Sequence, residues 1–179
     1  LKHLDPTLKY NREKKSEIKL SLFFKEESEY YKNRLQKNSI DFTIFLEDDF
    51  SISINRGKIV QIIDNLISNS EYWLIKLKGN DPNCKPSITI KIESPWIYFY
   101  DNGYGISPAI ENMLFEPFVT TKPKGEGRGL GLFIIQQLLD SSKCTIALEP
   151  FRNEHGRKYI FAINFSNICL LYTSDAADD

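Results

Sequence analysis

An aromatic run that ends in two closely spaced glycines constrains this chain most. Residues 96–100 read Trp-Ile-Tyr-Phe-Tyr, which is typical of a buried strand, and Asp-Asn-Gly-Tyr-Gly follows at 101–105. A carboxylate at the tip of a strand can accept a hydrogen bond from an exocyclic amine such as that of adenine. Gly103 and Gly105 would let a flat ring approach the backbone. The same pattern also suits an ordinary turn, so the neighbouring segments must decide between the two interpretations.

A second informative segment lies at 58–77, where apolar residues recur at intervals of three and four. This periodicity predicts one long helix with one buried face. Asn65 and Asn69 are one turn apart at the edge of that face. Their side-chain oxygens could hold a Mg²⁺ ion on nucleotide phosphates, because hard cations take oxygen ligands. The alternative interpretation is two solvated surface asparagines.

A glycine-rich stretch at 122–132 precedes a predicted helix at 133–139. Gly127, Gly129 and Gly131 stand at alternate positions there. Free backbone N–H groups and the positive end of a helix dipole favour a phosphate at such a place, although a flexible linker has the same composition. Neither a GxGxxG between strand and helix nor a GxxxxGK[ST] occurs, which excludes the Rossmann and Walker interpretations.

The remaining elements follow from the same periodicities. Further helices are expected at 18–37 and 107–114, a turn at 55–57, and strands at 40–46, 52–54, 87–93, 144–149 and 159–165. Strand 87–93 should pair with 96–100 in an antiparallel hairpin. The order of elements has few βαβ crossovers, so it predicts an α+β fold in which helices cover one face of a mixed, mostly antiparallel sheet.

Composition limits the class of protein. The chain has 179 residues, 41% hydrophobic and 26% charged, which fits one globular domain with its own core. A net charge of −1 favours neither nucleic acid nor an anionic membrane surface as partner. No apolar run reaches the length of a bilayer span and no signal peptide is visible, so we expect a cytoplasmic fragment without membrane contact. Its three scattered cysteines are expected to be reduced thiols.

Three regions are expected along the chain. Residues 1–17 are predicted to be a linker or the end of a missing upstream region, and residues 18–167 to be the folded domain. Residues 168–179 have no periodicity and resemble a translated sequencing-adapter tail, so we expect a non-native, disordered end.

Taken in order, four segments resemble the N, G1, F and G2 boxes of Bergerat-fold ATP-binding domains. These domains belong to the gyrase, heat-shock chaperone, histidine kinase and MutL (GHKL) superfamily. The matching segments are Asn-Leu-Ile-Ser-Asn at 65–69, Asp-Asn-Gly-Tyr-Gly at 101–105, Phe-Glu-Pro-Phe at 115–118 and Gly-Arg-Gly-Leu-Gly at 127–131. The resemblance covers residues 18–165 and is closest to histidine kinase catalytic domains, which carry an F box and a Gly-Leu-Gly-Leu ending. It implies a two-layer α/β sandwich.

The resemblance implies ATP and Mg²⁺ as ligands. Asp101 would bind the adenine amine, and Asn69, supported by Asn65, would ligate Mg²⁺. The residues that the resemblance implies for nucleotide binding are Asn69, Asp101, Gly103, Gly105, Ile106, Phe118, Gly127, Gly129, Leu130 and Gly131.

The same resemblance implies a lid over the nucleotide. Phe115 and Phe118 would anchor the lid, and the backbone of 127–131 would wrap the phosphates. Lys122 and Arg128 would neutralise the γ-phosphate. The implied catalytic set is Asn65, Asn69, Lys122 and Arg128.

One position bears on the type of activity. ATPases of this superfamily carry a glutamate four residues before the Mg-binding asparagine, where it activates the attacking water. That position is Asn65 here, an amide without useful basicity. Helical geometry places Asp64 and Glu71 on the side away from the sheet and the nucleotide. We therefore expect a protein that binds Mg-ATP and hydrolyses it slowly.

A histidine kinase also needs a phosphoacceptor histidine. His3 and His155 lie in no His-Glu-x-x-[Ser/Thr]-Pro pattern, so the acceptor is expected on a domain upstream or in trans, with a response regulator downstream. The resemblance thus implies the catalytic domain of a sensor histidine kinase, which transfers the γ-phosphoryl group of ATP to a histidine on another domain. The alternative function is an ATP-switched module of the chaperone or MutL type. A third reading is a relative that has lost nucleotide binding.

Overall fold

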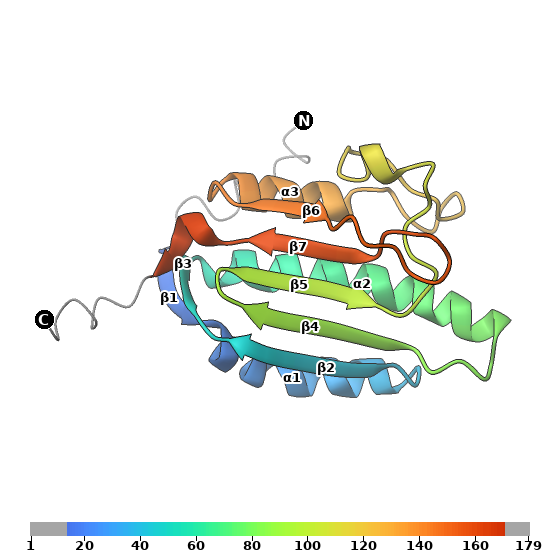
Figure 1. The fold of residues 1–179 in the computed structure, drawn as a ribbon, viewed down its shortest axis with the longest axis horizontal. Coiled ribbons are helices and arrows are strands. Elements are labelled where there is room, and N and C mark those ends of the chain that lie inside the picture. The colour runs from blue at the N-terminus through green and yellow to red at the C-terminus, as the bar shows by residue number, and fades with distance from the viewer. Residues whose placement is uncertain (1–13, 171–179) are drawn as a thin grey trace, which may run out of the picture.

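The computed structural model describes residues 14–170, and its main sheet has five strands in the order β2-β4-β5-β7-β6 (Figure 1). The strands are β2 (Asp41–Asp48), β4 (Ser87–Glu93), β5 (Trp96–Asp101), β6 (Thr145–Leu148) and β7 (Ile160–Asn164). Strands β2 and β4 are parallel, and the other pairs are antiparallel. The predicted hairpin of β4 and β5 is therefore confirmed.

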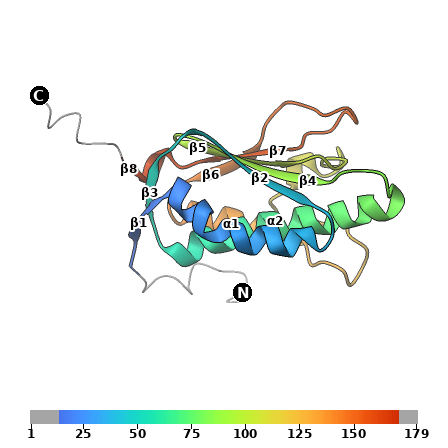
Figure 2. The ribbon, with the colours of Figure 1, turned by 90° about the horizontal axis from the view of Figure 1, so that it is seen from below.

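The α-helices of residues 14–170 pack on one face of this sheet, as the view from below shows (Figure 2). They are α1 (Leu20–Gln36), α2 (Arg56–Asn80) and α3 (Gly131–Asp140). A single cluster of buried apolar side chains fills the space between helices and sheet. This arrangement confirms the predicted α+β, two-layer fold.

The local sequence explains the elements that carry the site. In β4, Ile88, Ile90 and Ile92 alternate with polar residues and are fully buried, because alternate side chains of a strand point to the same face. Helix α2 begins after Asn55, whose side chain accepts a hydrogen bond from the Lys58 amide at 3.3 Å. The predicted turn at 55–57 is therefore an N-cap and the first residues of the helix.

A second, small sheet closes one end of the molecule, and of its strands only the one at 52–54 was predicted. It consists of β1 (Ser16–Lys19), β3 (Ser51–Ile54) and β8 (Cys169–Leu170), in the order β1-β3-β8. Ile18 pairs with Ile52 in this sheet, so α1 starts at Leu20 and not at residue 18 as predicted.

The helix predicted at 107–114 is wrong in type and length. Only the 3₁₀ turn η3 (Glu111–Met113) forms there. The amides of Ile110, Met113 and Glu116 each bond to the carbonyl three residues earlier, which is the 3₁₀ pattern and not the α-helical one. A second short 3₁₀ turn, η4 (Ser166–Ile168), precedes β8.

The ordered domain extends past both predicted boundaries, because β1 begins at Ser16 and β8 ends at Leu170. The rest of the predicted linker and tail, residues 1–13 and 171–179, lies outside the described residues. Among the described helices, none combines the length and the apolar character needed to cross a membrane.

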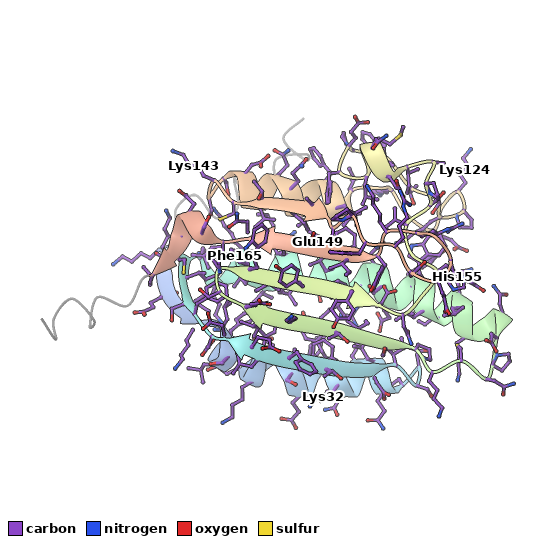
Figure 3. All side chains as sticks on the ribbon, in the orientation of Figure 1. Lys32, Lys124, Lys143, Glu149, His155 and Phe165 are labelled. Carbon is purple, nitrogen blue, oxygen red and sulfur yellow. The ribbon has the colours of Figure 1, made fainter. Side chains whose placement is uncertain are left out.

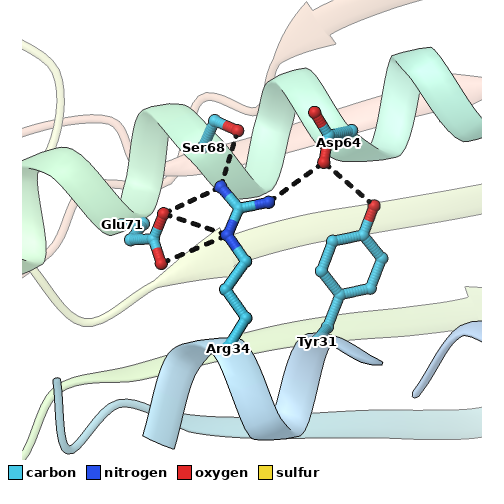
Figure 4. Close-up of polar contacts among 5 residues, drawn as sticks. All are labelled: Tyr31, Arg34, Asp64, Ser68 and Glu71. Atoms are coloured by element: carbon cyan, nitrogen blue, oxygen red, sulfur yellow. Dashed lines mark hydrogen bonds and ion pairs between the residues drawn. The ribbon is translucent and has the colours of Figure 1, made fainter. Parts of the chain in front are cut away.

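A polar network joins α1 to α2 (Figure 4). The Arg34 guanidinium donates to Glu71 at 2.8 Å, to Asp64 at 3.1 Å and to the Ser68 hydroxyl at 3.0 Å. Tyr31 also donates to Asp64, and burial together with this carboxylate raises the pKa of Tyr31. The side chains of Arg34 and Glu71 are only 25% and 16% exposed, so their pairing is sheltered from water.

We predict that Arg34→Ala lowers the free energy of unfolding by about 2 kcal/mol, because it leaves the sheltered Glu71 carboxylate without its charged partner. Urea unfolding measures this loss. The control is Arg56→Ala, whose pairs with Glu26 and Glu27 are more exposed and should contribute less than about 1 kcal/mol. Equal losses in the two variants would contradict this account of the helix pair.

Candidate functional site

A cavity of about 390 Å³ opens at the end of the sheet where β5 ends, a volume in the usual range for small-molecule sites. Its walls are α2, the segment after β5, the N-terminus of α3, the β6–β7 hairpin, and a segment that we call the lid, residues 119–130. Lys124 of the lid and His155 of the hairpin mark this end of the molecule in Figure 3, and Lys143 marks the opposite end.

Nearly all the residues that the sequence predicted for the site come together in this cavity. Those that line it are Asn65, Asn69, Asp101, Gly103, Gly105, Ile106, Lys122, Gly127, Arg128, Gly129, Leu130 and Gly131. Phe118 does not line it. That side chain is 64% exposed and has a φ of +66°. Phe115 instead packs on the core, with its ring 6.2 Å from that of Phe161.

The Asp101 carboxylate is fixed at the tip of β5 by two donors. The Ser70 hydroxyl of α2 donates to Oδ2 at 2.6 Å, and the Gly103 amide donates to Oδ1 at 2.9 Å. Burial raises the pKa of Asp101, while these two hydrogen bonds act in the opposite direction. The result is an oriented, sheltered acceptor at the wall of the cavity.

Packing within the protein favours glycine at positions 103 and 105, a reason that the sequence did not show. A Cβ on Gly105, whose φ is +91°, would lie 2.8 Å from both Arg157 Cβ and Asn153 Nδ2. A Cβ on Gly103 would lie 3.0 Å from Asp101 Oδ1. The position that a Cβ would take at each glycine is therefore occupied by the protein itself, and glycine allows the segment to pack against the hairpin and the carboxylate.

Asn65 and Asn69 reach the cavity from successive turns of α2. The Asn65 Nδ2 atom is buried and has no hydrogen-bond partner among the described residues. A buried amide nitrogen without a hydrogen-bond partner costs free energy unless a ligand accepts a hydrogen bond from it. A half-turn of the carboxamide would present its oxygen at the same place, and amide oxygens are ligands for Mg²⁺. The side-chain oxygens of Asn65 and Asn69 are therefore of the kind that a magnesium ion takes as ligands.

Acidic residues are scarce around the cavity. In the part of the chain that the structure describes, Asp101 is the one carboxylate that lines it. Asp64 and Glu71 bind Arg34 and face α1, as Figure 4 shows. Neither carboxylate lines the cavity, which agrees with their predicted position on another side of α2.

Another wall of the cavity is formed by the glycine-rich end of the lid and the start of α3. Gly129, with a φ of +70°, lies so close to the backbone of 118–119 that a Cβ would come within 2.6 Å of it. The Phe118 amide also donates to the Gly129 carbonyl at 3.0 Å, so the base of the lid is closed by backbone contacts. Gly131, the first residue of α3, has open space where a Cβ would be, which leaves its backbone accessible from the cavity.

Among the described residues, three cationic side chains line the cavity. Lys122 and Arg128 come from the lid, as predicted, and burial lowers the pKa of Lys122. Arg157 comes from the β6–β7 hairpin and was missed, because a lone arginine in a polar turn has no pattern that distinguishes it. Ser70 was also missed, since it falls within the apolar stripe of α2. A hydroxyl at an otherwise apolar, buried position was the available signal.

We predict that Ser70→Ala raises the pKa of Asp101 further, because the lost hydrogen bond favours the ionised form. The folded-state pKa already lies above the unfolded value. Stability therefore falls as the pH rises from the unfolded to the folded pKa, and the variant should extend that window upward. Carbon-13 NMR titration of the carboxyl group measures the shift. Ser68→Ala, which removes a contact with Arg34, is the control, and an unchanged or lowered pKa in Ser70→Ala would refute the assignment.

Comparison with known proteins agrees with this geometry. Residues 54–167, more than half of the chain, match the family described as histidine kinase-, DNA gyrase B-, and HSP90-like ATPase. The two-component sensor PprA of Pseudomonas aeruginosa is 34% identical over 88 residues, which cover 46% of this chain and 9% of PprA. The chain spans a quarter or less of the length of three such curated relatives.

Solved structures show the same fold. The catalytic domain of the histidine kinase ThkA is 24% identical with a TM-score of 0.64, and the match covers 86% of this chain and 97% of that domain. Full-length ShkA is 18% identical with a TM-score of 0.66, and the match covers 88% of this chain and 32% of ShkA. The four boxes, the fold and the family match agree. The chain belongs to the histidine kinase-, DNA gyrase B- and HSP90-like ATPase family.

Proposed function

We propose that this chain is the ATP-binding catalytic domain of a sensor histidine kinase, which binds Mg-ATP and transfers the γ-phosphoryl group to a histidine on another domain. One observation carries the proposal. A single cavity has an oriented carboxylate at one wall, the accessible N-terminus of α3 at another, and an asparagine pair on α2. These are complementary to a base, a phosphate chain and its metal ion. ShkA, which has the same fold, was solved in complex with AMPPNP.

The base would bind beside Asp101. A fixed carboxylate acceptor suits the exocyclic amine of adenine, and it would repel the carbonyl oxygen that guanine carries at the same ring position. Because Ser70 and Gly103 hold both carboxylate oxygens, the acceptor needs no reorientation when the base enters. Gly105 and Ile106 line the cavity next to it.

The phosphates would bind at the glycine-rich end. Gly127, Gly129, Leu130 and Gly131 line this end, and the N-terminus of a ten-residue helix favours negative charge there. The lid cations Lys122 and Arg128 line the same cavity and would neutralise the terminal phosphate.

Asn65 and Asn69 would hold the Mg²⁺ ion together with phosphate oxygens. No group of three or more His, Cys, Asp or Glu side chains within residues 14–170 could hold a metal ion by itself. That composition suits Mg²⁺, which is commonly bound by few protein ligands plus substrate phosphates. When bound, the ion would neutralise charge on the phosphates during transfer.

The scarcity of carboxylates favours transfer over hydrolysis. A general base must reach the attacking water, and Asp101, the one carboxylate that lines the cavity among the described residues, is already held by two donors. Asn65 stands where hydrolytic relatives would place a glutamate. A histidine acceptor carries its own nucleophilic nitrogen, so it needs no such base. The ATP-switched chaperone or MutL type is therefore the less favoured alternative.

We predict that Asp101→Ala lowers the affinity for a non-hydrolysable ATP analogue on the order of tenfold or more, because a hydrogen bond to a charged acceptor is lost. Isothermal titration calorimetry measures the change. Asp48→Ala is the control, since this exposed aspartate ends β2 on the same sheet. Unchanged affinity in Asp101→Ala would overturn the assignment of the base site.

We also predict that the isolated chain binds Mg-ATP but releases phosphate very slowly, because water in the cavity lacks a base. Steady-state phosphate release measures the rate, with Asp101→Ala as the background control. Fast release that disappears in Asp101→Ala would favour the ATP-switched alternative over the kinase.

A further inference from the structure

A cluster of four side chains connects the lid to α2 at the edge of the cavity. Tyr72 and Lys76 lie on successive turns of α2, and Lys122 and Glu126 lie on the lid. Tyr72 does not itself line the cavity, whereas Lys122 does. The cluster thus links a residue beside the site to a residue within it.

Tyr72 is at the centre of the cluster. The Lys122 ammonium lies 4.4 Å from the centroid of the Tyr72 ring, within the range of a cation–π contact. The Tyr72 hydroxyl donates a hydrogen bond to Glu126, which raises the pKa of Tyr72 to about 12 and lowers that of Glu126. Lys76 adds an ion pair with Glu126 at 3.5 Å and lies 5.6 Å from the same ring.

The lid has little else to hold its middle. The Lys122 amide donates to Thr120 Oγ1 and the Glu126 amide donates to the Pro123 carbonyl, both at 3.0 Å. Both of these hydrogen bonds are internal to the lid. Gly125 has open space around it. The contacts described for the middle of the lid with the rest of the protein therefore converge on Tyr72 and Lys76.

The position of the Lys122 side chain is set by its contacts with Gly127 and Tyr72. A Cβ on Gly127 would lie 2.6 Å from Lys122 Cδ, so the lysine stem runs directly over the backbone of that glycine. With its stem on Gly127 and its ammonium on the Tyr72 ring, Lys122 has a defined position at the cavity wall. A cation–π contact occupies one face of the ammonium, and the remaining N–H donors stay available for a ligand.

We infer that Tyr72 is a positioning residue that docks the lid on α2 and holds Lys122 where the terminal phosphate of the bound nucleotide would meet it. This inference rests on the proposed function, which identifies the ligand as ATP. It assigns the ring of Tyr72 to the placement of Lys122 and its hydroxyl to the placement of Glu126. Tyr72 should therefore matter for a triphosphate and not for a diphosphate.

The test compares Tyr72→Leu with Tyr72→Phe, which keeps the ring and loses only the hydroxyl. Calorimetric titrations with Mg²⁺ and either ADP or a non-hydrolysable ATP analogue give two affinities for each variant. Tyr72→Leu should weaken the triphosphate analogue by about two- to fivefold, the size of an exposed cation–π contact, and leave ADP unchanged. Tyr72→Phe should stay within about twofold of the wild type, because the ring contact remains. Tyr30→Leu, a change at a tyrosine of α1 that is 57% exposed, is the control.

A double-mutant cycle shows whether Tyr72 acts through Lys122. In a Lys122→Met background, Tyr72→Leu should have no further effect on the triphosphate affinity. An equal loss for both nucleotides, an additive loss in the double variant, or an unchanged ratio of the two affinities would overturn the inference.

A measurement without nucleotide separates this inference from the proposed function. Nitrogen-15 relaxation of the Gly125 and Gly127 amides should show a more mobile lid in Tyr72→Leu than in the wild type, with Tyr72→Phe in between. If the wild type binds neither nucleotide, the proposed function fails, yet the relaxation data still decide whether Tyr72 docks the lid. Equal mobility in Tyr72→Leu and the wild type would overturn the docking role.

Discussion

The packing of α2 onto the sheet is the interaction on which the rest of the structure depends. Ile62, Leu66 and Leu74 on its inner side are buried, and each such side chain contributes about 1.5–3 kcal/mol by leaving water. The other sides of the same helix carry side chains that contact α1, the cavity and the lid. They hold Arg34 of α1, line the cavity with the asparagine pair, and dock the lid through Tyr72. Because one helix fixes all of these groups, the geometry of the site follows from the core.

The fold was largely predictable because its main elements have strong local patterns. Alternation in β4, the three-and-four spacing in α2 and the glycines that end β5 each predict the element that forms. The strand at 52–54 was predicted, but its pairing in the small sheet was not predictable, because the strands of this sheet are two to four residues long and β8 pairs with β3 from the far end of the chain. Ile18 likewise continued the helical pattern but pairs with β3, since tertiary pairing outweighs a weak local preference.

The site was predictable at the level of its segments but not of its contacts. Three of the four boxes contribute residues that line the cavity, whereas the partners of Asp101 depend on how α2 passes the tip of β5. No pattern in one chain places Ser70 beside Asp101 or Arg157 beside Gly105, because these contacts join residues that are 31 and 52 positions apart. Gly105 has a second role that the sequence did not reveal, since a Cβ there would meet Arg157 and Asn153 of the β6–β7 hairpin.

If the proposed function is right, the base, phosphates and metal ion of one nucleotide occupy the cavity together. Titration of the nitrogen-15-labelled chain with Mg²⁺ and a non-hydrolysable ATP analogue tests this arrangement most directly. We expect the amides of Gly103 and Gly131 and the side-chain amides of Asn65 and Asn69 to shift together along one binding curve. A folded protein in which these signals do not move, or in which the two glycines respond with different affinities, would contradict it.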